Sequence, residues 1–150
     1  MDEVRKLGVE FSVEKKNFLI EGLGAMGSIT YTDAEIVKNT NYPESEGKSF
    51  PRVPEWTVNT VLSYSPIQDL SIVVGGRYAS KPYGDLDNSD NVEGVYGSYD
   101  SYLVFDTKIV YTFLKNWKMS LGVDNITDEL YHNSHPYPRR TYSAMLEAAF

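Results

Sequence analysis

The sequence predicts an all-β protein, specifically a segment of an antiparallel transmembrane β-barrel with about seven strands. Two observations predict this fold class. Apolar and polar residues alternate over strand-length segments along the chain, and no segment of helical length repeats its apolar residues every 3.6 positions. The connections also alternate between short turns and long loops, so in an antiparallel sheet every short turn lies at one end.

The first half of the chain contains four predicted strands, at residues 7–14, 22–31, 56–64 and 70–79. Each has one apolar face and one face rich in Gly, Ser, Thr or charge, as a strand between two different environments requires. On the apolar faces we place Leu7, Val9, Phe11, Val13, Leu23, Ala25, Ile29, Tyr31, Trp56, Val58, Leu62, Tyr64, Leu70, Ile72, Val74 and Tyr78.

The second half contains three more predicted strands, at residues 103–113, 117–124 and 141–150. The last strand has the clearest pattern, and the chain stops on its apolar face rather than on a polar tail. Because edge strands of soluble proteins tend to end in polar residues, we expect this face to meet lipid and to serve membrane assembly. Its residues are Tyr142, Ala144, Leu146, Ala148 and Phe150.

The connections divide into two groups. The short turns are residues 15–17, 65–69 and 114–116, and the long loops are residues 33–54, 80–101 and 125–139. Outer-membrane barrels keep short turns on the periplasmic side and long loops outside, and place aromatic girdles at both interfaces. Aromatic residues at strand ends match that arrangement: Tyr31, Trp56, Tyr64, Tyr78, Tyr111, Phe113, Trp117, Tyr142 and Phe150.

Composition excludes several classes of protein. The chain contains no cysteine, so a disulfide framework or a Cys-based zinc site is impossible. Its net charge of −7 argues against a nucleic-acid partner. The amino end shows no apolar segment of an export signal, so we expect either a cytoplasmic protein or part of something longer.

Alternation alone does not say which face is outside, and two alternatives remain at this point. A soluble lipocalin-like binding barrel would bury the apolar face, but its exterior should be richer in Lys and Glu than the polar face here. A small closed outer-membrane barrel of about eight strands, structural or adhesive, would fit the length. Its narrow interior should hold interlocking ion pairs rather than many Gly and Ser.

Several segments resemble TonB-dependent outer-membrane receptors. Residues 122–131 (GVDNITDELY), then 137–142 (YPRRTY) and the closing Phe150, are similar to the carboxyl end of that family. Three upstream segments resemble family segments in the same order and spacing: residues 8–10 (GVE), 28–34 (SITYTDA) and 47–54 (GKSFPRVP).

The resemblance implies that the chain is the last third of a barrel of about 22 strands with a plugged lumen. It implies uptake of a scarce ligand, most often a ferric siderophore, through the outer membrane of a Gram-negative cell, with energy from TonB and no catalysis or cofactor. We expect residues 1–150 to lack the plug domain, the TonB-coupling segment and a signal peptide. Seven strands do not enclose a wide lumen, so we expect no transport by this segment alone.

Candidate ligand contacts are the cationic and aromatic residues of the long loops and upper lumen, which suit an anionic or catecholate-bearing complex. For two of them, Arg139 and Arg140, the alternatives are turn residues or contacts to anionic headgroups. The candidates are Arg77, Tyr83, Tyr96, Tyr99, His132, His135, Tyr137, Arg139 and Arg140.

The sequence gives no convincing metal or catalytic site. Residues 85–91 have an acidic spacing faintly like a calcium loop, but Gly and the distal Glu fall at the wrong positions. His132 and His135 have no evident third ligand, and Pro136 prevents a helix there. We therefore predict a protein that binds a ligand and outer-membrane lipid, with no metal of its own.

Overall fold

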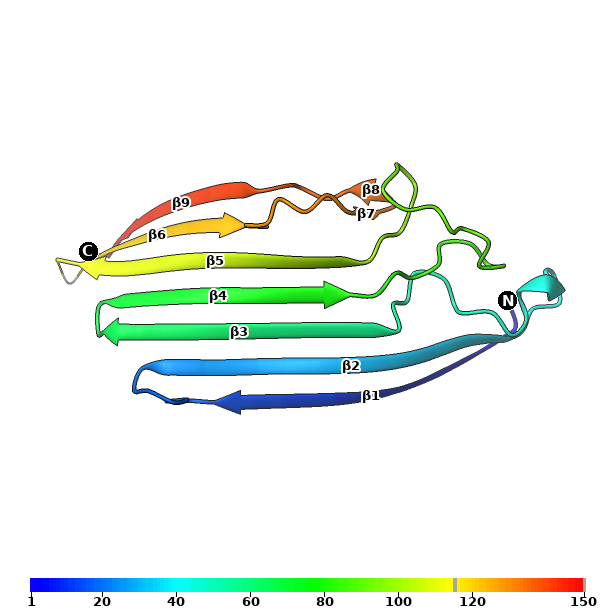
Figure 1. Cartoon of the computed structure of the whole chain (residues 1–150), viewed down its shortest axis with the longest axis horizontal. Helices are drawn as coiled ribbons and strands as arrows, with labels where there is room; N and C mark the ends of the chain where they lie inside the picture. The colour runs from blue at the N-terminus through cyan, green and yellow to red at the C-terminus, as the bar shows by residue number, and fades with distance from the viewer. Residues whose placement is uncertain (115, 150) are drawn as a thin grey trace.

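The computed structural model describes residues 1–114 and 116–149, which form one antiparallel seven-stranded sheet. Neighbouring strands follow one another in sequence, as Figure 1 shows. A small two-stranded ladder and one short 3-10 helix lie in the connections. The sheet consists of β1 (Glu3–Lys15), β2 (Leu23–Lys38), β3 (Trp56–Ile67), β4 (Leu70–Ala79), β5 (Tyr102–Phe113), β6 (Trp117–Asp124) and β9 (Thr141–Ala148). The other elements are η1 (Pro43–Ser45), β7 (His132–Asn133) and β8 (His135–Pro136).

The strand register keeps the apolar face continuous from one edge of the sheet to the other. Tyr31 lies opposite Trp56, and Leu121 lies opposite both Ile109 and Ala144. Because side chains alternate along each strand, this register also aligns the polar residues on the other face. The predicted two-faced sheet is confirmed.

The apolar face is exposed and does not form a core. Val9 and Phe11 are 71% and 66% exposed, and Leu62, Ile109 and Leu146 are exposed as well. The buried residues lie mainly under the long loops and at strand ends, among them Ile36, Tyr99, Val104 and Tyr131. A soluble barrel would bury its apolar face, so the lipocalin-like alternative does not describe this chain.

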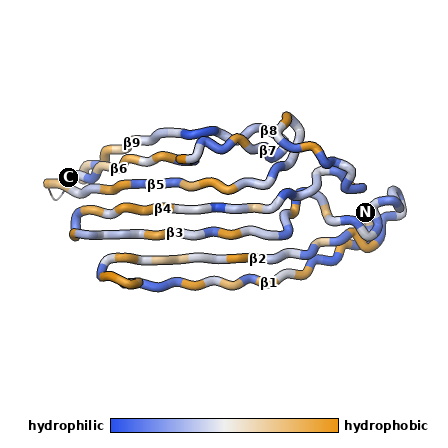
Figure 2. The backbone as a smooth tube through the Cα atoms, in the orientation of Figure 1, coloured by the Kyte–Doolittle hydropathy of each residue, from blue (hydrophilic) through white to orange (hydrophobic). Residues whose placement is uncertain are grey.

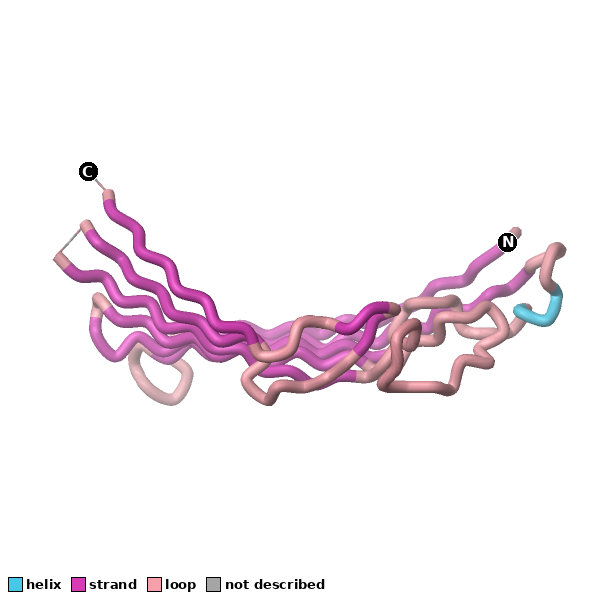
Figure 3. The backbone as a smooth tube through the Cα atoms, turned by 90° about the horizontal axis from the view of Figure 1, so that it is seen from above, coloured by secondary structure: helices cyan, strands magenta, loops and turns pink. Residues whose placement is uncertain are grey.

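The described residues do not close into a barrel. The strand order runs from β1 to β9 with no pairing between these two strands, and every residue of both is exposed. The turned view in Figure 3 shows the sheet bent and twisted, with its two edge strands unpartnered. This open sheet does not fit the small closed barrel.

The short turns lie at one end of the sheet and the long loops at the other (Figure 1). Residues 16–22, 68–69 and 114–116 join the strands at the first end, and residues 39–55, 80–101 and 125–140 at the second. The predicted segregation is therefore confirmed, although Lys115 of the predicted turn and Phe150 of the predicted last strand lie outside the described residues.

The predicted ends of the first two strands were wrong. β1 begins at Glu3 rather than at residue 7, and β2 continues to Lys38 through residues that the sequence had suggested as loop. The extension is held by an ion pair of Arg5 with Glu35 and a second contact of 3.7 Å between Arg5 and Asp33. On the opposite face of β2, Ala34 and Ile36 are buried under the following loop. Charged residues within a strand resemble a loop when only the sequence is considered.

Aromatic rings mark both borders of the apolar face. Tyr31 and Trp56 have ring centroids 4.8 Å apart near the loop end, and Phe113 stacks between Tyr111 and Trp117 near the turn end. Beyond Tyr31 the same side of β2 carries the charged Asp33 and Glu35. The apolar band therefore ends at Tyr31, and the hairpin of β1 and β2 extends past it.

No helix among the described residues has the length and apolarity needed to cross a membrane.

Candidate functional site

Three connected loops form the candidate site at the loop end of the sheet. Loop A is residues 39–55, loop B is residues 80–101, and loop C is residues 125–140, which include β7 and β8. Each loop makes hydrogen bonds with a neighbouring loop rather than extending separately. Long loops normally differ in position and are mobile. Because hydrogen bonds between these loops hold them together, we treat the three loops as one candidate site.

Loop A is tied to loop B by backbone and amide groups. The Arg52 N–H donates to the Tyr83 carbonyl over 2.6 Å. The Asn88 side chain accepts from the Ser49 N–H over 2.8 Å and donates to the Ser49 carbonyl over 3.0 Å. Two-way bonding by one amide fixes both the distance and the orientation of the two loops.

Loop B is tied to loop C by one buried carboxylate, Asp100. Its Oδ2 accepts from the His132 N–H over 2.8 Å and contacts the His132 Nδ1 at 2.9 Å. Its Oδ1 accepts from the Gly94 N–H over 2.9 Å and the Ser98 hydroxyl over 2.8 Å. Burial raises the pKa of Asp100, but these hydrogen bonds outweigh burial and hold the pKa below its usual value. Asp100 therefore stays ionised and joins the two loops.

Backbone pairing continues this junction. The Ser134 N–H donates to the Ser98 carbonyl over 2.9 Å, and the Gly97 N–H donates to the Ser134 carbonyl over 2.7 Å. Further out, the Tyr96 hydroxyl and the His135 Nε2 lie 2.9 Å apart, with their rings edge to face. Both histidines of the chain thus bond across the same pair of loops.

Three stacked tyrosines connect the sheet to loop C. The Tyr102 ring, at the start of β5, lies 4.4 Å from the Tyr131 ring, which lies 4.9 Å from that of Tyr137. Tyr131 is buried in the middle and Tyr137 is exposed. Burial raises the pKa of Tyr131, so its hydroxyl stays protonated near neutral pH.

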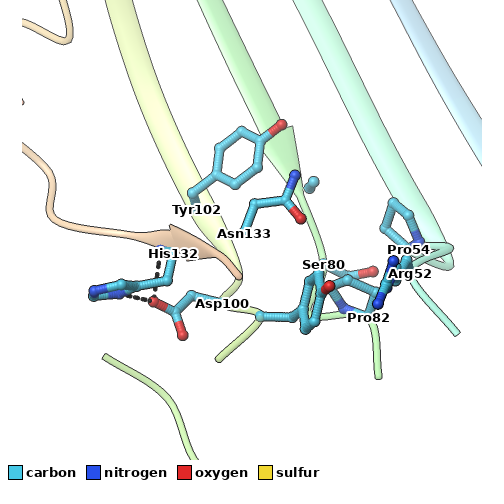
Figure 4. Close-up of a pocket in the computed structure, with 10 residues that line it drawn as sticks. Arg52, Pro54, Ser80, Pro82, Asp100, Tyr102, His132 and Asn133 are labelled. Carbon is cyan, nitrogen blue, oxygen red and sulfur yellow. Dashed lines mark hydrogen bonds and ion pairs between the residues drawn. The ribbon is translucent and has the colours of Figure 1, made fainter. Parts of the chain in front are cut away.

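A small pocket of about 100 Å³ lies between the three loops and the ends of β4 and β5, as Figure 4 shows. In the lining of this pocket, the Arg52 guanidinium lies over the Tyr99 ring, 5.7 Å from the ring centre. Position 84 requires glycine, because a Cβ there would lie 2.6 Å from the Tyr99 ring. The lining is Arg52, Pro54, Ala79, Ser80, Pro82, Tyr99, Asp100, Tyr102, His132 and Asn133.

Arg77 lies on the polar face of β4, below the loops. Its Nε contacts the Asp106 Oδ2 at 3.0 Å, and its Nη2 contacts Oδ1 at 3.3 Å. The Asp106 Oδ1 also accepts from the Asn125 N–H over 2.9 Å, which links the wall to the first residue of loop C. Asn125 is buried, and its side chain closes the loop by bonding the Glu129 N–H and carbonyl.

Arg139 and Arg140 are turn residues of loop C. The Arg139 Nη2 contacts the Asp128 Oδ2 at 2.7 Å, and the Arg140 N–H donates to the Asp128 Oδ1 over 3.0 Å. The Arg140 Nε donates to the Ile126 carbonyl over 2.9 Å. The hydrogen bond from Arg140 holds the pKa of Asp128 below its usual value. This geometry favours the turn interpretation of both arginines.

The other candidates divide by exposure. Tyr96 is 73% exposed, and His135 and Tyr137 are exposed as well, whereas Tyr99 and His132 are buried. Tyr83 is half-buried, and its carbonyl holds loop A. Sequence reasoning had not selected Arg52, Asp100, Tyr102 or Tyr131. Two signals existed: Arg52 and Tyr131 each lie within a segment that resembles the receptor family.

Comparison with known proteins identifies the family. The model of the family described as "TonB dependent receptor-like, beta-barrel" matches residues 1–126. The chain belongs to this family.

The relatives are much longer than this chain. The ferrichrome outer membrane transporter/phage receptor of Escherichia coli K12 is 34% identical over 133 residues, which cover 86% of this chain and 17% of the relative. The probable TonB-dependent siderophore receptor PiuA of Acinetobacter baumannii is 28% identical over 111 residues, 68% of this chain and 14% of the relative.

Solved structures show the same fold. The unliganded ferric citrate transporter FecA gives a TM-score of 0.80 at 19% identity over 95% of this chain and 24% of that one. The PiuA crystal structure gives 0.72 at 22% identity over 97% of this chain and 20% of that one. The predicted family and barrel fold are both confirmed.

Because the chain belongs to this family, we can assign the orientation of the sheet and its location in the outer membrane of Gram-negative bacteria. The apolar face meets lipid, and the polar face lines the lumen. The short turns are periplasmic, and loops A, B and C are extracellular. The Tyr31 and Trp56 pair lies at the outer interface, where aromatic rings with one polar edge are favoured.

Proposed function

We propose that the chain is the C-terminal part of the barrel domain of a TonB-dependent receptor that takes up a scarce ligand, most simply a ferric siderophore. Within that receptor, residues 1–150 supply barrel wall and extracellular ligand loops. The missing strands, a plug domain and the TonB-contacting segment belong to the rest of the receptor. Family membership and the open, lipid-facing sheet support this proposal.

One observation carries it. The three extracellular loops are joined by hydrogen bonds at the loop end of the sheet. The Arg52 guanidinium lies over the Tyr99 ring at a small pocket between them, and Tyr96, His135 and Tyr137 are exposed on loops B and C. Ferric siderophores are compact complexes whose catecholate or hydroxamate groups carry negative charge. Guanidinium groups and tyrosine rings bind such surfaces through charge-assisted hydrogen bonds and stacking.

The candidate residues take two roles in this proposal. Arg77, Tyr96, His135 and Tyr137 are exposed toward the lumen or outer solvent and are available to a ligand, and Arg52 joins them. Tyr83, Tyr99, His132, Arg139 and Arg140 hold the loops in place through the contacts described above.

The chain's relatives are transporters and receptors. We extend this to the segment itself, which we expect to bind ligand without changing it chemically. Residues 77, 100 and 106 carry charges whose partners are other side chains or backbone groups of the same wall and loops. These pairs position the loops.

The test is a chimera in which residues 1–150 replace the matching part of the E. coli ferrichrome transporter. Uptake of radioactive iron is measured with ferrichrome, a hydroxamate complex, and with ferric enterobactin, a catecholate complex. The proposal predicts uptake of at least one complex in a strain with TonB and none in a strain without it. A chimera that reaches the outer membrane yet binds neither complex contradicts the ferric-siderophore assignment.

A matched pair of variants tests the loop assignment in the same chimera. Tyr96→Ala removes an exposed ring whose hydroxyl lies 2.9 Å from the His135 Nε2 of loop C, and should weaken ligand binding at unchanged surface expression. Val92→Ala, at another exposed position of loop B, should leave binding unchanged. Equal effects of the two substitutions would assign binding to the loop as a whole rather than to its aromatic edge.

A further inference from the structure

The periplasmic turns expose apolar side chains where a turn normally carries polar residues. Phe18, Leu19 and Ile20 lie in the turn between β1 and β2, Ile67 lies at the end of β3, and Leu114 follows β5. Figure 2 shows hydrophobic segments at this end of the sheet. All five are exposed, so each of the three short connections carries or directly adjoins at least one such residue.

Two of these residues also have an unfavourable backbone conformation. Leu19 has φ of 65° and Leu114 has φ of 52°, in the left-handed region where Gly, Asn and Asp are favoured. Asn17, in the same turn as Leu19, follows that preference with φ of 52°. Among the described residues, Leu19 and Leu114 are the most exposed large apolar side chains, at 84% and 79%.

An exposed leucine with a left-handed backbone conformation has two separate energetic costs in water. Its Cβ crowds the backbone, and its side chain is hydrated, whereas asparagine would avoid both costs. Leucine is favoured only if the assembled protein surrounds it with an apolar environment. The backbone outlier and the exposure are independent observations, and both point to a contact made outside this chain.

The position of the turns identifies that environment. Ile67 lies opposite Leu70, which lies opposite Tyr111, so Ile67 continues the lipid-facing side. Leu114 directly follows Phe113, a member of the inner aromatic girdle. Ile67 is therefore continuous with the surface that meets lipid, and Leu114 adjoins the aromatic border of that surface.

Charge beside the first turn fits a phospholipid surface. Lys15 lies opposite Ala25, which lies opposite Leu62, so Lys15 ends the lipid-facing side of β1. Lys16 follows it, and both are exposed. Lysine at this depth extends its amine to lipid phosphates while its methylene groups stay in the apolar region.

We propose that Phe18, Leu19, Ile20, Ile67 and Leu114 form a collar that inserts into the periplasmic leaflet of the outer membrane, with Lys15 and Lys16 at its phosphates. The collar anchors the barrel wall by its turns as well as by its strands. This inference rests on the proposed function only in requiring that the segment be part of an assembled barrel.

The experiment measures spin-label accessibility in a cysteine-free receptor that carries residues 1–150, purified into phospholipid bilayers. These residues contain no cysteine, so each introduced cysteine gives one labelled site. Labels at Leu19→Cys and Leu114→Cys are compared for collisions with oxygen, which concentrates in lipid, and with a water-soluble nickel complex. Val9→Cys reports the lipid band, Ser89→Cys reports extracellular water, and Asn17→Cys and Asn116→Cys are matched positions in the same turns.

The proposal predicts that positions 19 and 114 resemble position 9, with oxygen collisions dominant, and that positions 17 and 116 are closer to water. A second measurement labels a neighbouring residue rather than the leucine itself: the label at position 17 should shift toward water when Leu19→Asn is added. If positions 19 and 114 instead resemble position 89, the collar is wrong, and a periplasmic protein partner, absent from the purified sample, becomes the alternative. If the label at position 9 itself collides mainly with the nickel complex, as a label in water does, then the membrane barrel assignment fails and not only the collar.

Discussion

At the scale of single residues, Asp100 determines how the extracellular loops are arranged. It accepts four hydrogen bonds, two within loop B and two from His132 of loop C. Hydrogen bonds to a buried charge are stronger than neutral ones, and removing the charge leaves several donors without a good acceptor. The exposed edge formed by Tyr96 and His135 depends on this junction, although neither residue contacts Asp100 directly.

Asp100→Asn should loosen loop C from loop B. We expect the free energy of local opening to fall by about 1–3 kcal/mol, the usual effect of losing hydrogen bonds to a buried charged group. Amide hydrogen exchange at Gly94 and His132 measures this opening in the assembled receptor. Asp90→Asn is the control, because Asp90 accepts from the Gly84 and Asp85 N–H groups of its own loop. Unchanged exchange at His132 would show that backbone pairing alone holds the loops.

The same contact should depend on pH in the acid range. Hydrogen bonds lower the pKa of Asp100 in the folded loops, so the contact contributes its full stability above the ordinary aspartate pKa of about 3.9. That stability is lost as the pH falls through the lower, folded pKa. Exchange at His132, corrected for its intrinsic pH dependence, should therefore be constant from pH 7 to about pH 5 and rise only below about pH 4. A rise between pH 7 and pH 5 would contradict this assignment.

At the scale of elements, each strand has to satisfy lipid on one side and an aqueous lumen on the other. Alternation in the sequence was sufficient to predict all seven strands of the sheet and both faces, because the lipid and lumenal environments impose a strict two-residue period. The end of β2 was missed because Asp33 and Glu35 are charged, and their pairing with Arg5 needs a strand that is distant in sequence. Likewise, the cross-loop role of Asp100 depends on contacts between loops that no local pattern records. The β7 and β8 ladder pairs only two residues of loop C on each side, which is too short to give an alternating pattern.

The site was predicted only in part, for the same reason. Residue type correctly placed cationic and aromatic candidates in loops B and C. It did not separate exposed side chains such as Tyr96 from Tyr99, which is three residues away and buried under Gly84. Burial in loops follows from tertiary contacts, and the sequence gives no periodicity there.

An introduced positive charge should destabilise the barrel to very different extents at two adjacent residues of β3. Leu62→Arg puts a cation on the lipid-facing side and should destabilise the barrel by about 2–4 kcal/mol, the range for a cation near the bilayer midplane. Ser63→Arg puts the same cation on the lumenal side and should destabilise the barrel much less. Unfolding by urea of the receptor in phospholipid vesicles measures both. Similar losses at the two positions would contradict the assignment of faces.

At the scale of the whole molecule, the sheet is a section of a wide barrel. Its edge strands, β1 and β9, have unpaired backbone groups that lipid does not satisfy, and an unsatisfied group in hydrocarbon costs several kcal/mol. Neighbouring strands of the receptor therefore have to pair with both edges. The loops, the lumenal Arg77 and Asp106 pair, and the lipid-facing band then occupy three separate regions of the barrel: its outer opening, its inner wall and its outer surface.

The most direct test of this account is a cysteine scan of residues 57–64 of β3 in the assembled receptor in bilayers, read by spin-label collisions with oxygen. With lipid on one face of β3 and the lumen on the other, we expect a two-residue period with maxima at positions 58, 60, 62 and 64 and minima at 57, 59, 61 and 63. A period of opposite phase, or positions 58 to 64 shielded from oxygen inside a compact monomer that needs no detergent, would contradict it.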